Sequence, residues 1–186
     1  MSSLASLKKE LRHHLKARWR LLASEIPPEW ESRLAENLDQ VLRRRGGTWA
    51  AFRPLPFEPS LPDPRERWSH IRWAYPRMEE TGLRFRVPAR FVPGPFGVQE
   101  PSGDSPAVEI AELDGLLIPG LGYDHRGRRL GRGRGFYDRS LKDARGLRVG
   151  VAFEFQRLKE LPSEAWDEPM DAVVTERSVY WIRKDR

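Results

Sequence analysis

The segment from Leu116 to Ser140 has the residue types and the spacing that a phosphate-binding site needs. Gly131, Gly133 and Gly135 recur at every second position, with arginine between them. Glycine tolerates positive φ and lets the backbone approach a ligand, so that several N–H groups can face one anion. Asp138 follows at the start of a predicted helix and offers an oxygen ligand of the kind that phosphate-bound Mg²⁺ prefers. The segment therefore predicts a polyphosphate site with a metal-binding carboxylate beside it.

The same segment has simpler interpretations. Its G-x-G-x-G spacing is neither the G-x-G-x-x-G of dinucleotide-binding folds nor a P-loop. An exposed Arg/Gly turn has this composition, and so does a basic arm over Arg126 to Arg134 that contacts nucleic acid. Residue chemistry alone leaves these alternatives open.

Composition limits the class of protein. The 186 residues suit one domain over 1–186, with a sizeable core. The absence of cysteine excludes disulfides, thiolate metal sites and cysteine nucleophiles. No apolar run is long enough to span a membrane, and the apolar core of a signal peptide is missing, so we expect a cytoplasmic protein without a membrane partner. The net charge of +6 favours anionic ligands without choosing among them.

Hydrophobic periodicity predicts the elements that must position the candidate residues. Apolar residues every three or four positions predict helices over 4–22 and 30–42. Apolar and alternating runs predict strands at 48–52, 71–75, 83–87, 115–118, 147–153, 172–175 and 179–182, the last at a sheet edge. Short helices are predicted at 65–69, 135–143 and 155–161, and loops at 54–64 and 88–107.

Strands that alternate with helices in this way predict an α/β fold. The expected architecture is a single-domain three-layer sandwich, in which helices flank a mainly parallel sheet. The sequence contains no internal repeat and no convincing domain boundary.

The glycine-rich segment resembles the signature of the 5-formyltetrahydrofolate cyclo-ligase family, also called methenyltetrahydrofolate synthetases. The matching residues are Pro119, Gly120, Asp124, Gly127, Arg129, Leu130, Gly131, Gly133, Gly135, Tyr137, Asp138 and Arg139. The resemblance covers nearly the whole chain and implies the same single α/β domain. It implies an enzyme that uses ATP and Mg²⁺ to convert 5-formyltetrahydrofolate, with or without a polyglutamate tail, into 5,10-methenyltetrahydrofolate. We expect a monomer that binds no nucleic acid.

The resemblance also implies which residues bind ATP. The family begins with a Lys-x-x-x-Arg helix whose side chains reach the ATP phosphates, and the matching residues here are Lys8, Lys9, Glu10, Leu11 and Arg12. The ATP site would continue over Arg129, Leu130, Gly131, Arg132, Gly133, Arg134, Gly135, Phe136 and Tyr137. Among these, Arg134 and Tyr137 are the implied catalytic residues. Without the resemblance, Lys8 and Arg12 would be a solvated face of a helix.

For the folate, the resemblance implies contacts from Arg53, Glu58 and Phe96, and from Arg132, Gly133, Arg134, Gly135 and Phe136. Taken alone, Glu58 would be an exposed loop carboxylate. Phe96 begins a segment, Phe96 to Pro101, that resembles the family's aromatic-Gly-Ile-x-Glu-Pro. Its ring would stack on a flat pterin, or it would anchor a long loop to the core.

Asp138 and Asp171 are the implied Mg²⁺ ligands. Asp171 immediately precedes the predicted strand 172–175, and a carboxylate at a strand end beside a phosphate loop suits the ion. Alone, it would be an ordinary turn residue. The histidines have no metal-ligand spacing: His13, His14, His70 and His125.

Two rival functions stay open. One is nucleic-acid binding through the basic arm, against which the regular glycine spacing argues. The other is phosphoryl transfer to a different small molecule, which only the resemblance disfavours.

In the implied reaction, ATP phosphorylates the formyl oxygen and the folate's N10 then attacks the activated carbon. Phe136 departs from the family's tyrosine, so the ring is kept and the hydroxyl is absent.

Overall fold

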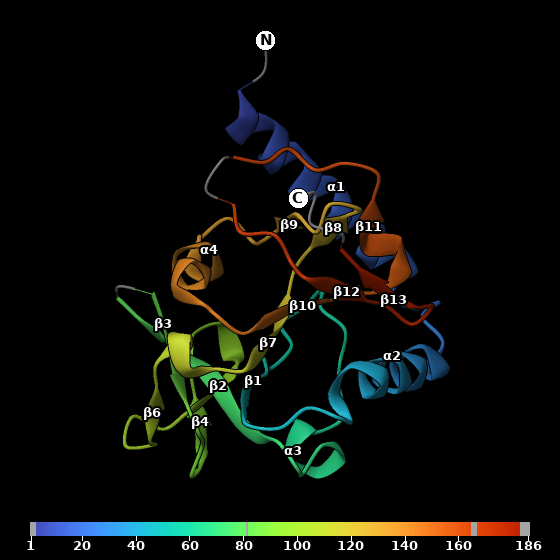
Figure 1. Ribbon diagram of the computed structural model, residues 1–186. Helices are drawn as coiled ribbons and strands as arrows, with labels where there is room; N and C mark the ends of the chain where they lie inside the picture. The colour runs from blue at the N-terminus through green and yellow to red at the C-terminus, as the bar shows by residue number, and fades with distance from the viewer. Residues whose placement is uncertain (1–2, 81, 165–166, 183–186) are drawn as a thin grey trace.

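The computed structural model describes residues 3–80, 82–164 and 167–182. Its centre is an eight-stranded sheet in the order β13-β12-β10-β7-β1-β2-β3-β6, with helices on both sides (Figure 1). The strands are β1 (Thr48–Ala50), β2 (Arg72–Glu79), β3 (Gly82–Arg86), β6 (Ala107–Val108), β7 (Gly115–Pro119), β10 (Leu147–Val151), β12 (Ala172–Val174) and β13 (Val179–Trp181). The strands from β12 to β2 are parallel, and β13, β3 and β6 are antiparallel to their neighbours. The mainly parallel α/β fold is therefore confirmed.

Helices cover both faces of the sheet. They are α1 (Leu4–Leu22), α2 (Pro28–Leu42), α3 (Pro64–Arg67) and α4 (Phe136–Ser140), with 3₁₀ turns η1 (Pro95–Gly97), η2 (Ile110–Glu112), η3 (Leu141–Asp143) and η4 (Glu154–Gln156). On one face, Leu34 and Leu38 of α2 are fully buried among sheet residues such as Val149. On the other face, Leu141 packs with Ile118. Leucines four positions apart share one side of a helix, which is why α2 forms against the sheet.

Two small sheets were not predicted. Strands β8 (Gly122–Asp124), β9 (Arg129–Leu130) and β11 (Arg157–Leu158) form a three-stranded sheet. The predicted helix at 155–161 is wrong, because one 3₁₀ turn leads into β11. The predicted loop at 88–107 contains a hairpin of β4 (Phe91–Pro93) and β5 (Gln99–Pro101). Strands of two or three residues are too short for a periodicity signal.

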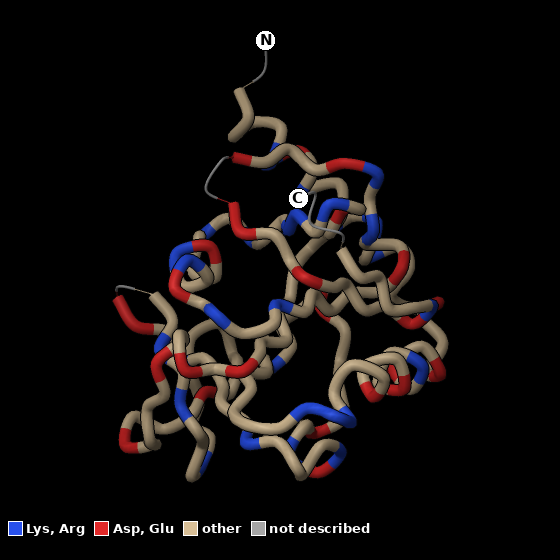
Figure 2. The backbone as a smooth tube through the Cα atoms, viewed as in Figure 1, with Lys and Arg blue, Asp and Glu red and all other residues tan. Residues whose placement is uncertain are grey.

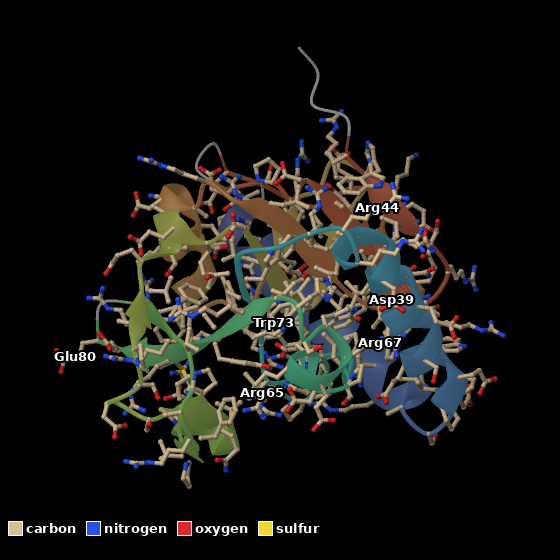
Figure 3. The ribbon with its side chains drawn as sticks, turned by 60° about the horizontal axis from the view of Figure 1, so that its bottom comes forward. Asp39, Arg44, Arg65, Arg67, Trp73 and Glu80 are labelled. Carbon is tan, nitrogen blue, oxygen red and sulfur yellow. The ribbon has the colours of Figure 1, made fainter. Side chains whose placement is uncertain are left out.

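Strand β2 is longer than predicted and serves two partners. Residues 72–74 pair with β1, and residues 75–79 pair with β3. Pro76 does not end the strand, although proline cannot donate to a ladder. Figure 3 labels Trp73 near the middle of the molecule and Glu80 at the far end of the hairpin. The second half of β2 thus extends beyond the parallel strands.

A polar contact ties α3 to α2. Asp39 accepts hydrogen bonds from Arg67 Nη2 at 2.7 Å and from Trp68 Nε1 at 2.7 Å. The side chains of Asp39 and Arg67 lie between the two helices in Figure 3. Within the described ranges, no helix has both the length and the apolar character that a membrane span requires.

Candidate active site

A cleft opens at the carboxyl edge of the parallel strands, where Gly120 follows β7 and Arg53 lies beyond β1. Ligands commonly bind at this edge of open α/β sheets. Apolar lining comes from Phe52, Leu55, Tyr75, Pro76, Met78, Leu83, Val98, Pro119 and Phe136. Polar or glycine lining comes from Arg53, Glu58, Gln99, Glu100, Gly120, Arg129, Gly131, Arg132, Arg134, Gly135, Tyr137 and Asp138.

The glycine loop, residues 129–135, lies along the cleft as the sequence predicts. Gly133 has φ +98°, and a Cβ there would stand 3.3 Å from Arg12 Cζ. Gly135 has φ +66° and is the N-cap of α4. Both positions favour glycine because L side chains are strained at such angles. Since α4 has only five residues, its dipole is short, and the arginines supply most of the positive charge.

Arg129 and Asp138 form an ion pair inside the cleft. Arg129 Nη2 donates to Asp138 Oδ1, and Arg129 Nη1 donates to Pro119 O at 3.2 Å. The Arg129 side chain is 6% exposed and the Asp138 side chain 39%. The guanidinium also lies 5.4 Å from the ring centroid of Tyr137. Asp138 is thus the more exposed partner of an ion pair whose other side chain is buried.

Glu58 is buried, so the view of it as an exposed loop carboxylate is wrong. Its side chain is 4% exposed and accepts from Arg132 Nε at 2.9 Å and from the Leu55 backbone N–H at 2.9 Å. Arg132 also donates to Pro56 O. Burial raises the pKa of Glu58, and the nearby Arg132 charge opposes that rise. The pair fastens the loop after β1 to the glycine loop.

Arg53 lies beside two aromatic rings. Its Cζ is 4.3 Å from the ring centroid of Phe91 and 5.7 Å from that of Tyr75. Among the described residues, no hydrogen-bond partner faces Arg53 Nε, Tyr75 Oη or Arg129 Nε, although all three atoms are buried. Because unpartnered buried donors are costly, these atoms are suited to meet acceptors of a ligand.

The aromatic candidates divide into two groups. Phe136 and Tyr137 line the cleft, and burial raises the pKa of Tyr137 far above its ordinary value, which keeps the hydroxyl protonated. Phe96 is 54% exposed and is not among the lining residues. It contacts Arg134, whose Cζ lies 4.2 Å from the ring centroid. Phe96 therefore neither anchors the hairpin to the core nor lies inside the cleft.

The residues of the first helix that were predicted to bind ATP have different partners in the structure. Arg12 donates from Nε to Gly131 O at 2.9 Å, which places its guanidinium on the glycine loop. Lys8 donates instead to Glu164 at 2.8 Å and to Asp167 at 2.9 Å. Lys9 and Glu10 are exposed, and Leu11 packs beside the small sheet.

Burial opposes the charge of Lys8, but its hydrogen bonds to Glu164 and Asp167 outweigh burial and raise the pKa of Lys8. The ammonium group is therefore held by two carboxylates in this structure. Of the five predicted residues, Arg12 is the one that donates a hydrogen bond to the glycine loop.

The fold does not bring Asp171 together with Asp138. Asp171 precedes β12, and its Oδ2 accepts from the Arg148 backbone N–H at 2.8 Å. Since β12 runs parallel to β10 and β7, Asp171 lies toward the amino edge, whereas the cleft is at the carboxyl edge. A two-carboxylate magnesium site is therefore not supported. In the described part of the chain, no three acidic or histidine side chains gather as a metal site.

The cleft includes residues that the sequence did not single out, notably Tyr75, Met78, Leu83 and Glu100. Three of them lie on the β2–β3 hairpin, and Glu100 lies on β5. The alternation of Leu83, Phe85 and Val87 was the available signal for β3, but nothing local indicated which face would border a ligand.

The chain is similar to known proteins over much of its length. A sequence model of the 5-formyltetrahydrofolate cyclo-ligase family matches residues 61–176. The 5-formyltetrahydrofolate cyclo-ligase of Escherichia coli K12 is 35% identical over 102 residues, which cover 53% of this chain and 56% of the relative. The enzyme of that name from Mycolicibacterium smegmatis is 41% identical over 91 residues, 47% of each chain. The chain thus spans about half the length of these curated relatives.

Solved structures extend the likeness across the fold. An NMR structure of 5,10-methenyltetrahydrofolate synthetase from Aquifex aeolicus is 31% identical, with a TM-score of 0.82 covering 97% of this chain and 95% of its own. A 5,10-methenyltetrahydrofolate synthetase from Mycoplasma pneumoniae has a TM-score of 0.74, covers 91% of this chain and 98% of its own, and is 22% identical. At that identity the second likeness concerns the fold alone.

Proposed function

Because this chain belongs to the 5-formyltetrahydrofolate cyclo-ligase family, we propose that it converts 5-formyltetrahydrofolate into 5,10-methenyltetrahydrofolate, using ATP with Mg²⁺ and releasing ADP and phosphate. The observation that carries the proposal is the meeting of the family's glycine loop with Glu58 and Arg53 in one cleft. The loop offers backbone N–H groups and arginines for phosphates, and the apolar lining offers a surface for a flat ring system.

The chemistry explains why ATP is needed. The formyl group on N5 is an amide, and its oxygen leaves poorly. Transfer of the γ-phosphoryl group from ATP to that oxygen gives a phosphorylated imidate and ADP. The lone pair of N10 then attacks the activated carbon, the C–O bond breaks, phosphate leaves with its electron pair and N10 loses its proton. The attack is intramolecular, so the effective concentration of N10 is high.

The residues of the cleft support positioning and charge stabilisation, which are the main needs of phosphoryl transfer. Arg12 and the glycine loop would hold the phosphates, and Arg134 would balance the charge on the transferring group. Tyr137, kept protonated by burial, would donate a hydrogen bond and not act as a base. Lys8 would have to leave Glu164 and Asp167 to reach a phosphate.

The donor set also suits a metal bound mainly by substrate. Mg²⁺ commonly takes one or two carboxylates plus phosphate oxygens, and the partly exposed Asp138 lines the cleft. When bound with ATP, the ion would neutralise charge on the phosphates. Asp138 would hold it, and Arg129 would fix the position of the Asp138 carboxylate.

The rival functions have less support. Figure 2 shows Lys and Arg distributed along the described backbone and interspersed with Asp and Glu. This disfavours a nucleic-acid surface, which needs clustered basic residues. A phosphotransferase for another small molecule is disfavoured by the family match and by the 31% identity to a methenyltetrahydrofolate synthetase.

One assay tests the proposal. The near-ultraviolet absorbance of the methenyl product should grow when enzyme, 5-formyltetrahydrofolate, ATP and Mg²⁺ are all present. Omitting any one of them should abolish the signal, and ADP release should match product formation. Folded protein that hydrolyses ATP with a different acceptor, and yields no methenyl product, would support the phosphotransferase instead.

A further inference from the structure

The cleft contains a second buried carboxylate, Glu100, to which nothing so far assigns a role. Its side chain is 3% exposed. Oε1 accepts from the Met78 backbone N–H at 3.1 Å, and Oε2 lies 3.9 Å from Arg77 Nη1. That separation is too long for a hydrogen bond. Among the described residues, Oε2 therefore has an ion-pair neighbour and no donor.

The backbone holds this carboxylate in place. A Cβ on Gly94 would stand 2.5 Å from Glu100 Cγ and 2.6 Å from Cδ, so the hairpin backbone packs directly against the side chain. Arg77 Nη1 donates to Pro101 O at 2.8 Å, which keeps its guanidinium next to the same hairpin. A side chain fixed in this way is pre-organised for a ligand, because no rotamer freedom remains to be lost on binding.

The surroundings of Glu100 define what its free oxygen can accept. Val98, two positions before Glu100, contributes apolar lining. Tyr75 and Met78 contribute more from β2, which contacts the strand that carries Glu100. Glu58, the other buried carboxylate of the cleft, already accepts from Arg132 and Leu55. Of the two buried carboxylates, Glu100 is therefore the one with an open acceptor position, in a cleft whose other charged groups are mostly arginine.

We propose that Glu100 recognises the pterin ring of the folate by accepting hydrogen bonds from its N3–H and its 2-amino group. This inference rests on the proposed function and adds the residue that orients the substrate. These two donors lie side by side on one edge of a flat ring, which matches a carboxylate set in an apolar cleft. N5 lies on the other ring of the pterin. Holding the donor edge at Glu100 therefore leaves the formyl group to extend toward the glycine loop.

The test compares two ligands with two proteins by calorimetry in the absence of ATP. The ligands are 5-formyltetrahydrofolate and its analogue with methyl in place of the 2-amino group. The proteins are wild type and Glu100→Gln, whose amide oxygen can still accept from the Met78 N–H. Glu100→Gln should bind the parent roughly 10–100-fold more weakly, as loss of a charged hydrogen bond predicts. Glu100→Gln should weaken binding of the analogue by a smaller factor than binding of the parent, because the analogue keeps the N3–H donor but lacks the 2-amino donor.

Glu79→Gln is the matched control. Glu79 follows Met78 on β2, pairs with Arg86 at 3.5 Å and does not line the cleft, so this variant should bind like wild type. If Glu100→Gln weakens both ligands equally, or neither, the assignment of Glu100 is overturned while wild-type turnover still supports the proposed function. If wild type itself fails to bind or convert 5-formyltetrahydrofolate, both proposals fail.

Discussion

Arg132 and Glu58 are 74 positions apart in the chain, yet Arg132 Nε donates to Glu58 Oε1 at 2.9 Å. The pair joins the two segments that carry the proposed phosphate and folate contacts. The Glu58 side chain is buried, and the Arg132 side chain is partly exposed in the cleft. The contribution of Glu58 to the stability of the fold should therefore depend on pH.

We expect Glu58→Gln to change how stability varies with pH. Burial raises the pKa of Glu58 above its ordinary value of 4.5, although Arg132 opposes the rise. The folded protein then binds this proton more tightly than the unfolded chain, so the contribution of Glu58 to stability falls as pH rises through that window. Thermal melts from about pH 4 to about pH 7 should show the glutamine variant gaining relative to wild type. A difference in Tm that is constant with pH would contradict this, and Glu109→Gln, at an exposed position, is the control.

Asp138→Asn should lower kcat by about a hundredfold or more, because one phosphate-site ligand is lost. It should also lower stability by about 1 kcal/mol or less, since Arg129 keeps a neutral acceptor where it had a charged one. The rate is measured as Mg²⁺ is titrated, with melting curves alongside. Asp143→Asn changes an exposed acid at the end of the same helical segment and should leave both unchanged. Near-normal activity of Asp138→Asn at limiting Mg²⁺ would rule out the metal role.

Substitutions of Arg12 and Lys8 should have different effects, although the two residues lie one helical turn apart. Arg12→Ala should raise the KM for ATP about tenfold, because a charged hydrogen bond of about 1.5 kcal/mol at the phosphates is lost. Lys8→Ala should act mainly on stability, by about 1 kcal/mol, since Glu164 and Asp167 lose their partner. Arg33→Ala, at an exposed position on α2, is the control for both measurements. Equal ATP effects for Lys8 and Arg12 would show that Lys8 leaves its carboxylates when ATP binds.

Phe136 should contribute to folate binding through its aromatic ring. Phe136→Tyr should stay within a few-fold of wild type in kcat/KM, whereas Phe136→Ala should lose about 1–3 kcal/mol of stacking and burial, mainly in the KM for folate. Phe96→Ala removes a ring outside the cleft lining and should have a smaller effect. Steady-state kinetics with each substrate varied in turn will distinguish these outcomes. A folded Phe136→Ala enzyme with unaltered folate kinetics would make Phe136 a packing residue.

Local sequence was enough for the features that are contiguous in the chain. The glycine loop and Asp138 lie within ten residues, so their chemistry could be predicted together and the cleft contains them. Helices α1 and α2 followed from leucine spacing, because each buries one stripe of side chains.

Features made by long-range pairing could not be predicted in this way. Tyr75 and Glu100 reach the cleft because β2 runs on past β1 and contacts the β4–β5 hairpin. Asp171 is a different case, because the direction of the predicted strand was enough to predict at which edge of the sheet it lies. A residue that precedes a parallel strand lies at the amino edge, whereas Gly120 follows one and lies at the carboxyl edge.

The double pairing of β2 also limits how this chain can vary in length. Met78 and Leu83 are cross-strand partners, and both border the cleft. Deleting one residue between Ala74 and Met78 would turn every later side chain of the strand to the opposite face, while β1 kept its register with the first half. Insertions and deletions between Ala74 and Met78 should therefore be rare among related sequences. They should be tolerated near exposed Gly103, in the turn after β5. A library of single-residue deletions should show that contrast without any substrate being added.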